Sequence, residues 1–130
     1  MENKTTVTVV IIVLIMLLGG GYWVYNSQHA KHVKLHDFAI CIKDSGAQFY
    51  GAFWCPHCQN QKALFDTLFE SASGSLPYTE CSTPDANGQL EICDQQDINI
   101  YPTWKFNDGS KREGEVGLQE LSQLTACPLP

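Results

Sequence analysis

The chain has 130 residues, which is enough for one small domain and a short appendage. It carries 8 Lys and Arg against 14 Asp and Glu, a net charge of −6. Phosphate binding requires a cationic face, so this acidic balance argues against a nucleic-acid-binding protein.

Six cysteines in so short a chain are the strongest compositional feature. An even number of cysteines in a small domain indicates disulfides, and disulfides persist in oxidising compartments. The alternative is a cytosolic protein whose cysteines bind a metal or lie scattered in the core. The apolar N-terminus favours the oxidising compartment.

A short tail, residues 1–6, is followed by an uncharged apolar stretch, residues 7–25. A helix of this length spans about 28 Å, close to the thickness of a bilayer core. Tyr22, Trp23 and Tyr25 end the stretch, and aromatic side chains favour the membrane interface. We therefore expect a transmembrane anchor.

Two other interpretations of residues 7–25 are a cleaved signal peptide and a buried core helix. Cleavage favours small residues at positions −1 and −3. A cut after Ala30 places Gln28 at −3, and a cut after Ser27 places Tyr25 there. Neither residue is small, which favours a retained anchor. A core helix is disfavoured because the stretch has no polar face.

Residues 26–34 are polar and are predicted to link the anchor to a single domain, residues 35–130. Apolar residues at helical spacing predict a helix over 35–43. The aromatic-rich residues 48–54 predict a buried strand.

The remaining predicted elements alternate between helices and short strands, separated by Gly, Pro, Asn and Ser turns. The first is a helix that begins at Pro56 and ends at Ser73-Gly74, with an apolar stripe of Leu64, Phe65, Leu68 and Phe69. It is followed by a strand over 76–81, a loop over 82–88 and a helix over 89–96. The chain then forms a strand over 104–106, a hairpin turn at Asn107-Asp108-Gly109, a return strand ending near Val116, and a last helix carrying Leu118, Leu121 and Leu124.

The predicted order is therefore α-β-α-β-α-β-β-α. A helical crossover between the first two strands predicts parallel pairing, and the final hairpin adds antiparallel strands. The fold class is α/β, a mixed sheet flanked by helices and preceded by one transmembrane helix.

The motif Cys55-Pro56-His57-Cys58 lies where the first strand meets its helix. Pro56 suits a first helical turn, and the helix N-terminus together with His57 should stabilise a thiolate on Cys55. Cys55 is then the exposed nucleophile, and Cys58, one turn deeper, is the resolving thiol. The alternative is half of a zinc site. A structural zinc usually needs a second C-x-x-C or His pair, and Cys81 and Cys93 stand twelve positions apart, so we expect no metal.

Phe53-Trp54-Cys55-Pro56-His57-Cys58, followed some forty residues later by Tyr101-Pro102-Thr103, resembles the thioredoxin superfamily. Gly51–Gln59, Pro77–Cys81 and Tyr101–Trp104 are more narrowly similar to the thioredoxin-like domain associated with bacterial vitamin K epoxide reductase homologues. The resemblance covers about residues 37–127.

This resemblance implies that Pro102 follows a cis peptide bond and that the loop of Tyr101, Pro102 and Thr103 lines the site and pairs with the substrate backbone. It also implies that Trp54 packs beside the cysteines. The alternatives are a trans-proline entering an edge strand and a tryptophan that is simply part of the core. A departure from the family is Phe49, because thioredoxins usually bury an acid at that position. Proton transfer at Cys58 must then use another group, such as water or Glu80.

The resemblance further implies a disulfide between Cys81 and Cys93, where the subfamily often carries one. Cys41 and Cys127 remain, and we expect them to be bridged. An alternative role for Cys81–Cys93 is a relay of electrons to or from Cys55–Cys58.

These features predict a membrane-anchored thiol–disulfide oxidoreductase that acts on protein cysteines outside the cytoplasm and needs no bound cofactor. Pro-His between the cysteines resembles disulfide-forming oxidases, which implies re-oxidation by a quinone-linked membrane partner of the vitamin K epoxide reductase type. The alternatives are a membrane-tethered disulfide reductase and a non-catalytic thioredoxin-fold binding module or metal carrier.

Overall fold

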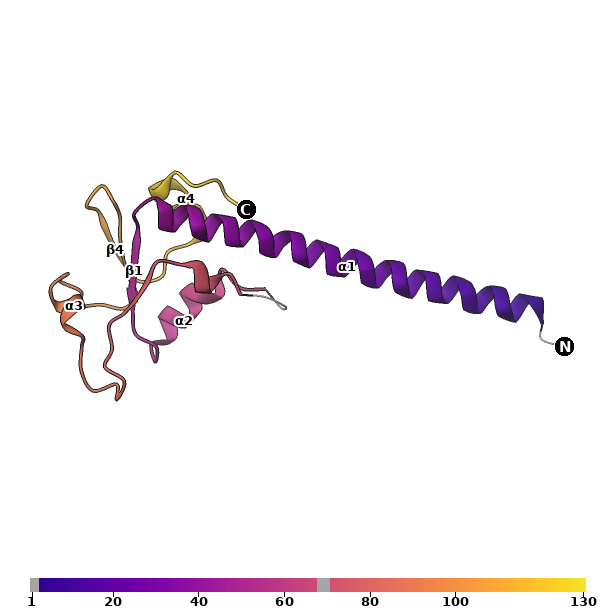
Figure 1. The fold of residues 1–130 in the computed structure, drawn as a ribbon, viewed down its shortest axis with the longest axis horizontal. Coiled ribbons are helices and arrows are strands. Elements are labelled where there is room, and N and C mark those ends of the chain that lie inside the picture. The colour runs from indigo at the N-terminus through magenta and orange to yellow at the C-terminus, as the bar shows by residue number, and fades with distance from the viewer. Residues whose placement is uncertain (1–2, 68–70) are drawn as a thin grey trace.

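A computed structural model describes residues 3–67 and 71–130 of the chain. Its first helix, α1 (Lys4–Asp44), is 41 residues long, and its N-terminal part projects away from the rest of the molecule (Figure 1). The predicted linker, residues 26–34, is helical and continues into the predicted helix over 35–43. Residues 26–34 contain neither glycine nor proline, so nothing in them interrupts the helical hydrogen bonds.

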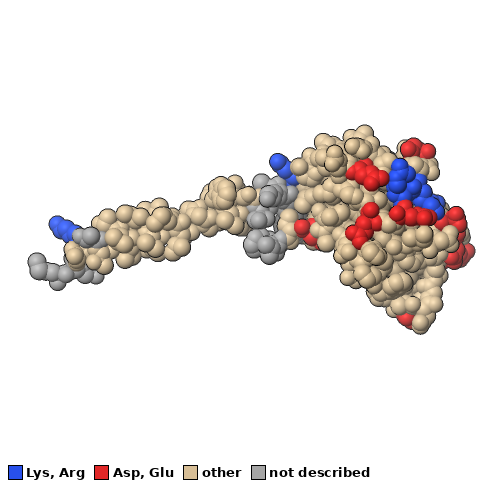
Figure 2. Space-filling model, turned by 180° about the vertical axis from the view of Figure 1, so that it is seen from behind, with Lys and Arg blue, Asp and Glu red and all other residues tan. Residues whose placement is uncertain are grey.

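The segment Thr6–Ser27 of α1 has a mean hydropathy of 2.4 and is not buried against the rest of the described chain. This segment contains no Asp, Glu, Lys or Arg, and the tan part of the projecting helix in Figure 2 accordingly shows no charged side chain. Its length and composition make it a candidate membrane span, properties that an N-terminal signal sequence shares.

The sheet has four strands in the order β2-β1-β3-β4. They are β1 (Gln48–Gly51), β2 (Tyr78–Glu80), β3 (Thr103–Lys105) and β4 (Lys111–Glu113). Strands β1 and β2 are parallel, whereas β1–β3 and β3–β4 are antiparallel. The predicted mixed sheet and its terminal hairpin are confirmed.

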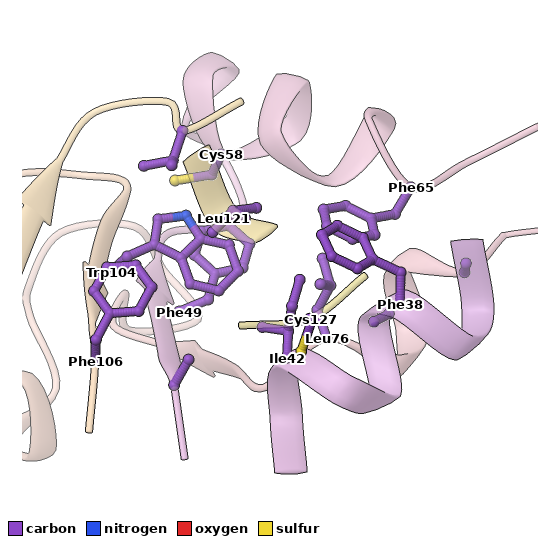
Figure 3. Close-up of a cluster of buried hydrophobic side chains, with 14 of the residues drawn as sticks. Phe38, Ile42, Phe49, Cys58, Phe65, Leu76, Trp104, Phe106, Leu121 and Cys127 are labelled. Atoms are coloured by element: carbon purple, nitrogen blue, oxygen red, sulfur yellow. The ribbon is translucent and has the colours of Figure 1, made fainter. Parts of the chain in front are cut away.

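Four short helical segments accompany the sheet: α2 (Pro56–Ala63), the 3-10 turn η1 (Ser73–Ser75), α3 (Glu91–Asp94) and α4 (Leu118–Thr125). The main core joins side chains from α1, α2 and α4 to one face of the sheet, among them Phe38, Cys58 and Leu121 (Figure 3). A smaller core around Tyr50 and Ile98 includes Cys93 of α3. Helices therefore flank the sheet on both faces.

Helix α2 ends at Ala63, well before the predicted end at Ser73-Gly74. The carboxylate of Asp66 accepts hydrogen bonds from the Ser71 hydroxyl at 2.5 Å and the Ser73 amide at 3.1 Å. These bonds draw the chain into a loop in place of further helical turns. Phe65 is buried as predicted, whereas Leu68 and Phe69 lie outside the described residues.

The centre of the main core is a stack of aromatic rings on the sheet. The Phe49 and Trp104 rings lie 4.7 Å apart at an interplanar angle of 9°, and Trp104 stacks in turn on Phe106. Because side chains alternate along a strand, Tyr50 points to the opposite face and packs with the smaller core. Phe49 is thus a packing residue beneath the start of α2.

Candidate active site

The Cys55-Pro56-His57-Cys58 motif lies at the end of β1, where the chain turns into α2. Cys55 is the N-cap residue of α2, and Pro56 occupies the first helical position, where no amide hydrogen is required. The Cys55 amide donates to the Ala52 carbonyl at 3.0 Å, which closes the turn. Local sequence therefore places Cys55 at the helix N-terminus and Cys58 in its first turn.

Both motif cysteines are free thiols, and both are buried. Cys58 is 1% exposed and Cys55 6%, so the prediction of an exposed Cys55 is wrong in degree, although Cys55 is the more accessible of the two. The physical reason is the loop that follows Ile100, because the Tyr101 carbonyl lies 3.8 Å from the Cys55 sulfur and accepts its thiol hydrogen.

Burial raises the pKa of Cys58 from its ordinary value of 9.0 to about 12, and the adjacent Cys55 adds to the rise. A hydrogen bond with the Ala52 backbone and, to a smaller extent, the positive charge of Lys62 act in the opposite direction. Cys58 is therefore a protonated thiol at neutral pH, and any step that needs its thiolate needs a group that stabilises the charge.

The loop of Tyr101, Pro102 and Thr103 borders Cys55, as the sequence predicts. The peptide bond between Tyr101 and Pro102 is cis. Thr103 is fully buried, and its hydroxyl donates to the Ile100 carbonyl at 2.7 Å. These contacts hold the Tyr101 carbonyl against the Cys55 sulfur.

Trp54 lies on the rim of the site and is not part of the core. It is 48% exposed, its indole N–H donates to the Ser82 hydroxyl at 2.8 Å, and its ring meets that of Tyr101 edge to face. Phe53 beside it is also 48% exposed. The approach to Cys55 is therefore bordered by aromatic surface that a protein substrate can cover.

Glu115 is a site residue that the sequence analysis missed. Its Oε1 lies 2.6 Å from Nδ1 of His57 and accepts a hydrogen bond from Asn60 at 3.1 Å. The bond to His57, followed by that to Asn60, lowers the pKa of the Glu115 carboxyl. No local motif marks Glu115, because it follows His57 by 58 residues.

Gln61 is a second missed residue, and it joins α2 to the segment before α4. Its side chain is fully buried, donates to the Val116 carbonyl at 2.9 Å and accepts from the Val116 amide at 2.6 Å. In the same segment the Gly114 amide donates to the Pro102 carbonyl at 2.8 Å. Helix α2 and the proline loop are thus held to one another through residues 114–116.

Glu80, which we considered as a proton-transfer group, has its carboxylate engaged elsewhere. It accepts hydrogen bonds from the Phe53 amide at 3.2 Å, the Ser82 amide at 2.9 Å and the Tyr78 hydroxyl at 2.7 Å. Burial, together with the bond to Glu80, raises the pKa of Tyr78. Glu80 therefore ties the loop before Cys55 to β2.

The other four cysteines form the two disulfides Cys41–Cys127 and Cys81–Cys93, with Cα–Cα distances of 5.9 Å and 5.6 Å. Cys41–Cys127 links α1 to the segment after α4, and Cys81 and Cys93 lie in the smaller core. Cys55 and Cys58 remain as the free pair in the part of the chain that the structure describes.

Comparison with known proteins agrees with this arrangement. The family model described as thioredoxin matches residues 29–127. The chain is 40% identical over 92 residues to the thiol-disulfide oxidoreductase LTO1 of Arabidopsis thaliana, covering 68% of this chain and 23% of that protein. It is 27% identical over 96 residues to the protein disulfide isomerase-like 5-1 of Oryza sativa subsp. japonica, covering 68% of this chain and 65% of that protein.

The chain thus spans about a quarter of the first relative and less than two thirds of the second. The match to the family model covers most of the chain and includes the motif cysteines, the cis-proline loop and the whole sheet. The chain belongs to the thioredoxin family.

Proposed function

We propose that this protein is a membrane-tethered thiol–disulfide oxidoreductase that acts on protein cysteines outside the cytoplasm. The observation that carries the proposal is the free pair Cys55 and Cys58 at the start of α2, with the cis-proline loop against the Cys55 sulfur. The likeness to LTO1, whose name describes a thiol-disulfide oxidoreductase, supports the same chemistry.

In the oxidising direction, a substrate thiolate attacks the Cys55 sulfur of a Cys55–Cys58 disulfide. The bond between the two cysteines breaks, Cys58 leaves as a thiolate, and a mixed disulfide joins the substrate to Cys55. A second substrate thiolate then attacks the substrate sulfur of that bond and releases Cys55. The substrate loses two electrons, and the Cys55–Cys58 pair gains them.

The direction we propose is oxidation. Pro56-His57 between the cysteines resembles disulfide-forming oxidases. Phe49 stands where thioredoxins usually bury an acid that helps to deprotonate the resolving thiol, which argues against efficient reductase activity. A quinone-linked membrane partner of the vitamin K epoxide reductase type would then re-oxidise the pair, passing its two electrons to the quinone. The two other disulfides, Cys41–Cys127 and Cys81–Cys93, are consistent with an oxidising compartment.

The membrane tether is proposed from α1. Its Thr6–Ser27 segment is uncharged and unburied. The same helix enters the domain core through Phe38 and Ile42. An anchor continuous with the domain would hold Cys55 near membrane-embedded partners.

The reduction potential of the Cys55–Cys58 pair tests the direction. A value near about −120 mV, as in strong oxidases, supports our proposal, whereas a value near about −270 mV would make the protein a reductase. The measurement is equilibration of the full chain in detergent with glutathione buffers, with thiol labelling of Cys55 as the readout.

A trapping experiment tests whether the protein is an enzyme at all. A Cys58→Ala variant cannot resolve mixed disulfides, so it should accumulate substrates bound to Cys55 that a reductant releases. The matched control is Cys55→Ser, which should trap nothing and lose exchange activity. A binding module would instead retain its partners in the Cys55→Ser variant.

A further inference from the structure

The indole N–H of Trp104 is a buried donor without an acceptor. Trp104 is 0% exposed, and its Nε1 finds no hydrogen-bond partner within residues 3–67 and 71–130. An unpaired buried N–H costs free energy, and native structures seldom leave one without a reason.

The position of Trp104 places that donor on the same face of the sheet as the resolving cysteine. Trp104 lies opposite Phe49 in the β1–β3 register, and Gly51 shares the Phe49 face because side chains alternate along a strand. A Cβ atom built on Gly51 would lie 2.8 Å from the Cys58 sulfur, so that sulfur packs on the same face.

The close-up of the core agrees with this register. Figure 3 shows the nitrogen-bearing edge of the Trp104 ring turned toward the sulfur of Cys58, and both residues belong to one buried cluster. The stacked Phe49 and Phe106 rings hold the indole plane in place.

We propose that the Trp104 indole N–H donates a hydrogen bond to the Cys58 sulfur when that sulfur is a thiolate. A thiolate is a far better acceptor than a thiol, so the bond forms as the charge appears. The inference rests on the proposed function, because it assigns a stabilising group to the buried half of the same exchange reaction.

The Cys58 thiolate already has support from a hydrogen bond with the Ala52 backbone and from the charge of Lys62, both of which lower the pKa of Cys58, and the Trp104 indole would add a further donor. The Lys62 ammonium lies 3.3 Å from the centroid of the Tyr78 ring, and the Tyr78 hydroxyl donates to Glu80. Phe49 replaces the acid that thioredoxins usually bury at that position. A neutral N–H donor also suits a site that must hold a thiolate only transiently, since it adds no permanent charge to the core.

The hydrogen bond can act in both directions of exchange, and it adds no atom, proton or electron to either reaction. When a substrate thiolate attacks Cys55 in the Cys55–Cys58 disulfide, Cys58 is the leaving group, and the indole N–H stabilises it as it departs. When Cys58 instead attacks the Cys55 sulfur of a mixed disulfide, its proton goes to water, the Cys55–Cys58 bond forms, and the substrate leaves as a thiolate that water protonates. The indole keeps its proton throughout.

The test is stopped-flow mixing of the reduced full chain in detergent with an aromatic disulfide that releases a coloured thiolate, such as dithionitrobenzoate. The first phase of colour reports attack by Cys55, and the second reports resolution by Cys58. The informative variant replaces Trp104 with benzothienylalanine, which keeps the ring shape but has sulfur in place of N–H. Trp104→Phe is the second variant, and Phe106→Leu is the packing control.

We expect the second phase to slow about tenfold in both Trp104 variants, the loss expected for one hydrogen bond to a charged group. The first phase should be retained, and Phe106→Leu should keep both phases within about twofold, because it removes no hydrogen-bond donor.

A benzothienylalanine variant that resolves at the wild-type rate would overturn the inference, as would an equal slowing in Phe106→Leu. A wild-type chain that lacks the second phase altogether would overturn the proposed function as well, so the two failures are distinguishable.

Discussion

His57 Nδ1 lies 2.6 Å from Oε1 of Glu115, so the residue between the two motif cysteines is paired with the segment that precedes α4. Asn60, one helical turn further along α2, donates to the same oxygen. Together with the buried Gln61, these side chains form a hydrogen-bonded contact between one face of α2 and residues 115–116. The redox motif is thus positioned by residues far from it in sequence.

The His57–Glu115 pair should appear in the acid stability of the protein. The pKa of Glu115 is lowered from its ordinary value of 4.5, mainly by the bond to His57. A carboxyl with a lowered pKa stabilises the fold above its ordinary pKa and loses that contribution as pH falls below it. Glu115→Gln should therefore lose less stability than wild type when the pH falls from about 6 to about 3.

Urea unfolding across this pH range measures the effect. The control is the cycle of Glu115→Gln, His57→Gln and the double variant. If the changes in unfolding free energy of the two single variants add up to that of the double variant at every pH, the pair makes no contribution to acid sensitivity.

Gly51 should not tolerate a side chain. A Cβ atom there would lie 2.8 Å from the Cys58 sulfur and 3.0 Å from Cε2 of Tyr78. Gly51→Ala should cost about 1–3 kcal/mol of unfolding free energy through overpacking and should slow exchange by displacing Cys58.

The matched control is Gly117→Ala, because a Cβ atom on Gly117 meets nothing within 4 Å. Chemical denaturation of both variants provides the comparison. Equal stabilities would contradict the close packing of Gly51 on Cys58.

Gln61 should be more important for stability than a surface glutamine. Replacing it with leucine leaves the buried Val116 amide and carbonyl without partners, at a cost of about 2–4 kcal/mol for two unsatisfied groups. The neighbouring Asn60→Ala, which removes an exposed bond, should cost less than about 1 kcal/mol. Urea unfolding midpoints measure the difference, provided that the slope of unfolding free energy against urea concentration is unchanged. Similar costs for the two variants would contradict this contact between α2 and residues 115–116.

The two disulfides should contribute unequally to the free energy of unfolding. Cys41 and Cys127 are separated by 86 positions, which in the chain-entropy view corresponds to about 4–5 kcal/mol. Cys81 and Cys93 are separated by 12 positions, which corresponds to about 3 kcal/mol. The double alanine variant of each pair, unfolded in urea with Cys55 and Cys58 intact, tests this order. The reverse order would refute an account based on loop closure.

The resolving step should depend on pH through Cys58. Because burial raises its pKa to about 12, its thiolate fraction should increase about tenfold per pH unit across neutral and mildly alkaline pH. The second phase of the stopped-flow reaction should increase in parallel, without a plateau below about pH 9.

Lys62→Met should slow this phase about two- to threefold, since its charge favours the thiolate. The control is Lys105→Met, because the Lys105 ammonium donates to the Gln96 carbonyl. This substitution should leave the second phase unchanged. A plateau near neutral pH would contradict a buried, protonated Cys58.

Helix α2 shows where sequence patterns misled us. The apolar periodicity of Leu64 and Phe65 favoured a continuing helix, and Phe65 does enter the core. The helix nevertheless ends at Ala63, because Asp66 bonds to Ser71 and Ser73. Periodicity reports which side chains are buried, but it does not show whether backbone amides bond along a helix or to a nearby carboxylate.

By itself the sequence determined the element order, the mixed sheet and the position of Cys55-Pro56-His57-Cys58 at a helix start, because these depend on neighbouring residues and turn signals. Only the tertiary structure decided which distant groups meet there: Glu115 at His57, Gln61 at Val116, and Trp104 in the same buried cluster as Cys58. Such contacts depend on how separate elements pack, and packing is a property of the folded chain as a whole.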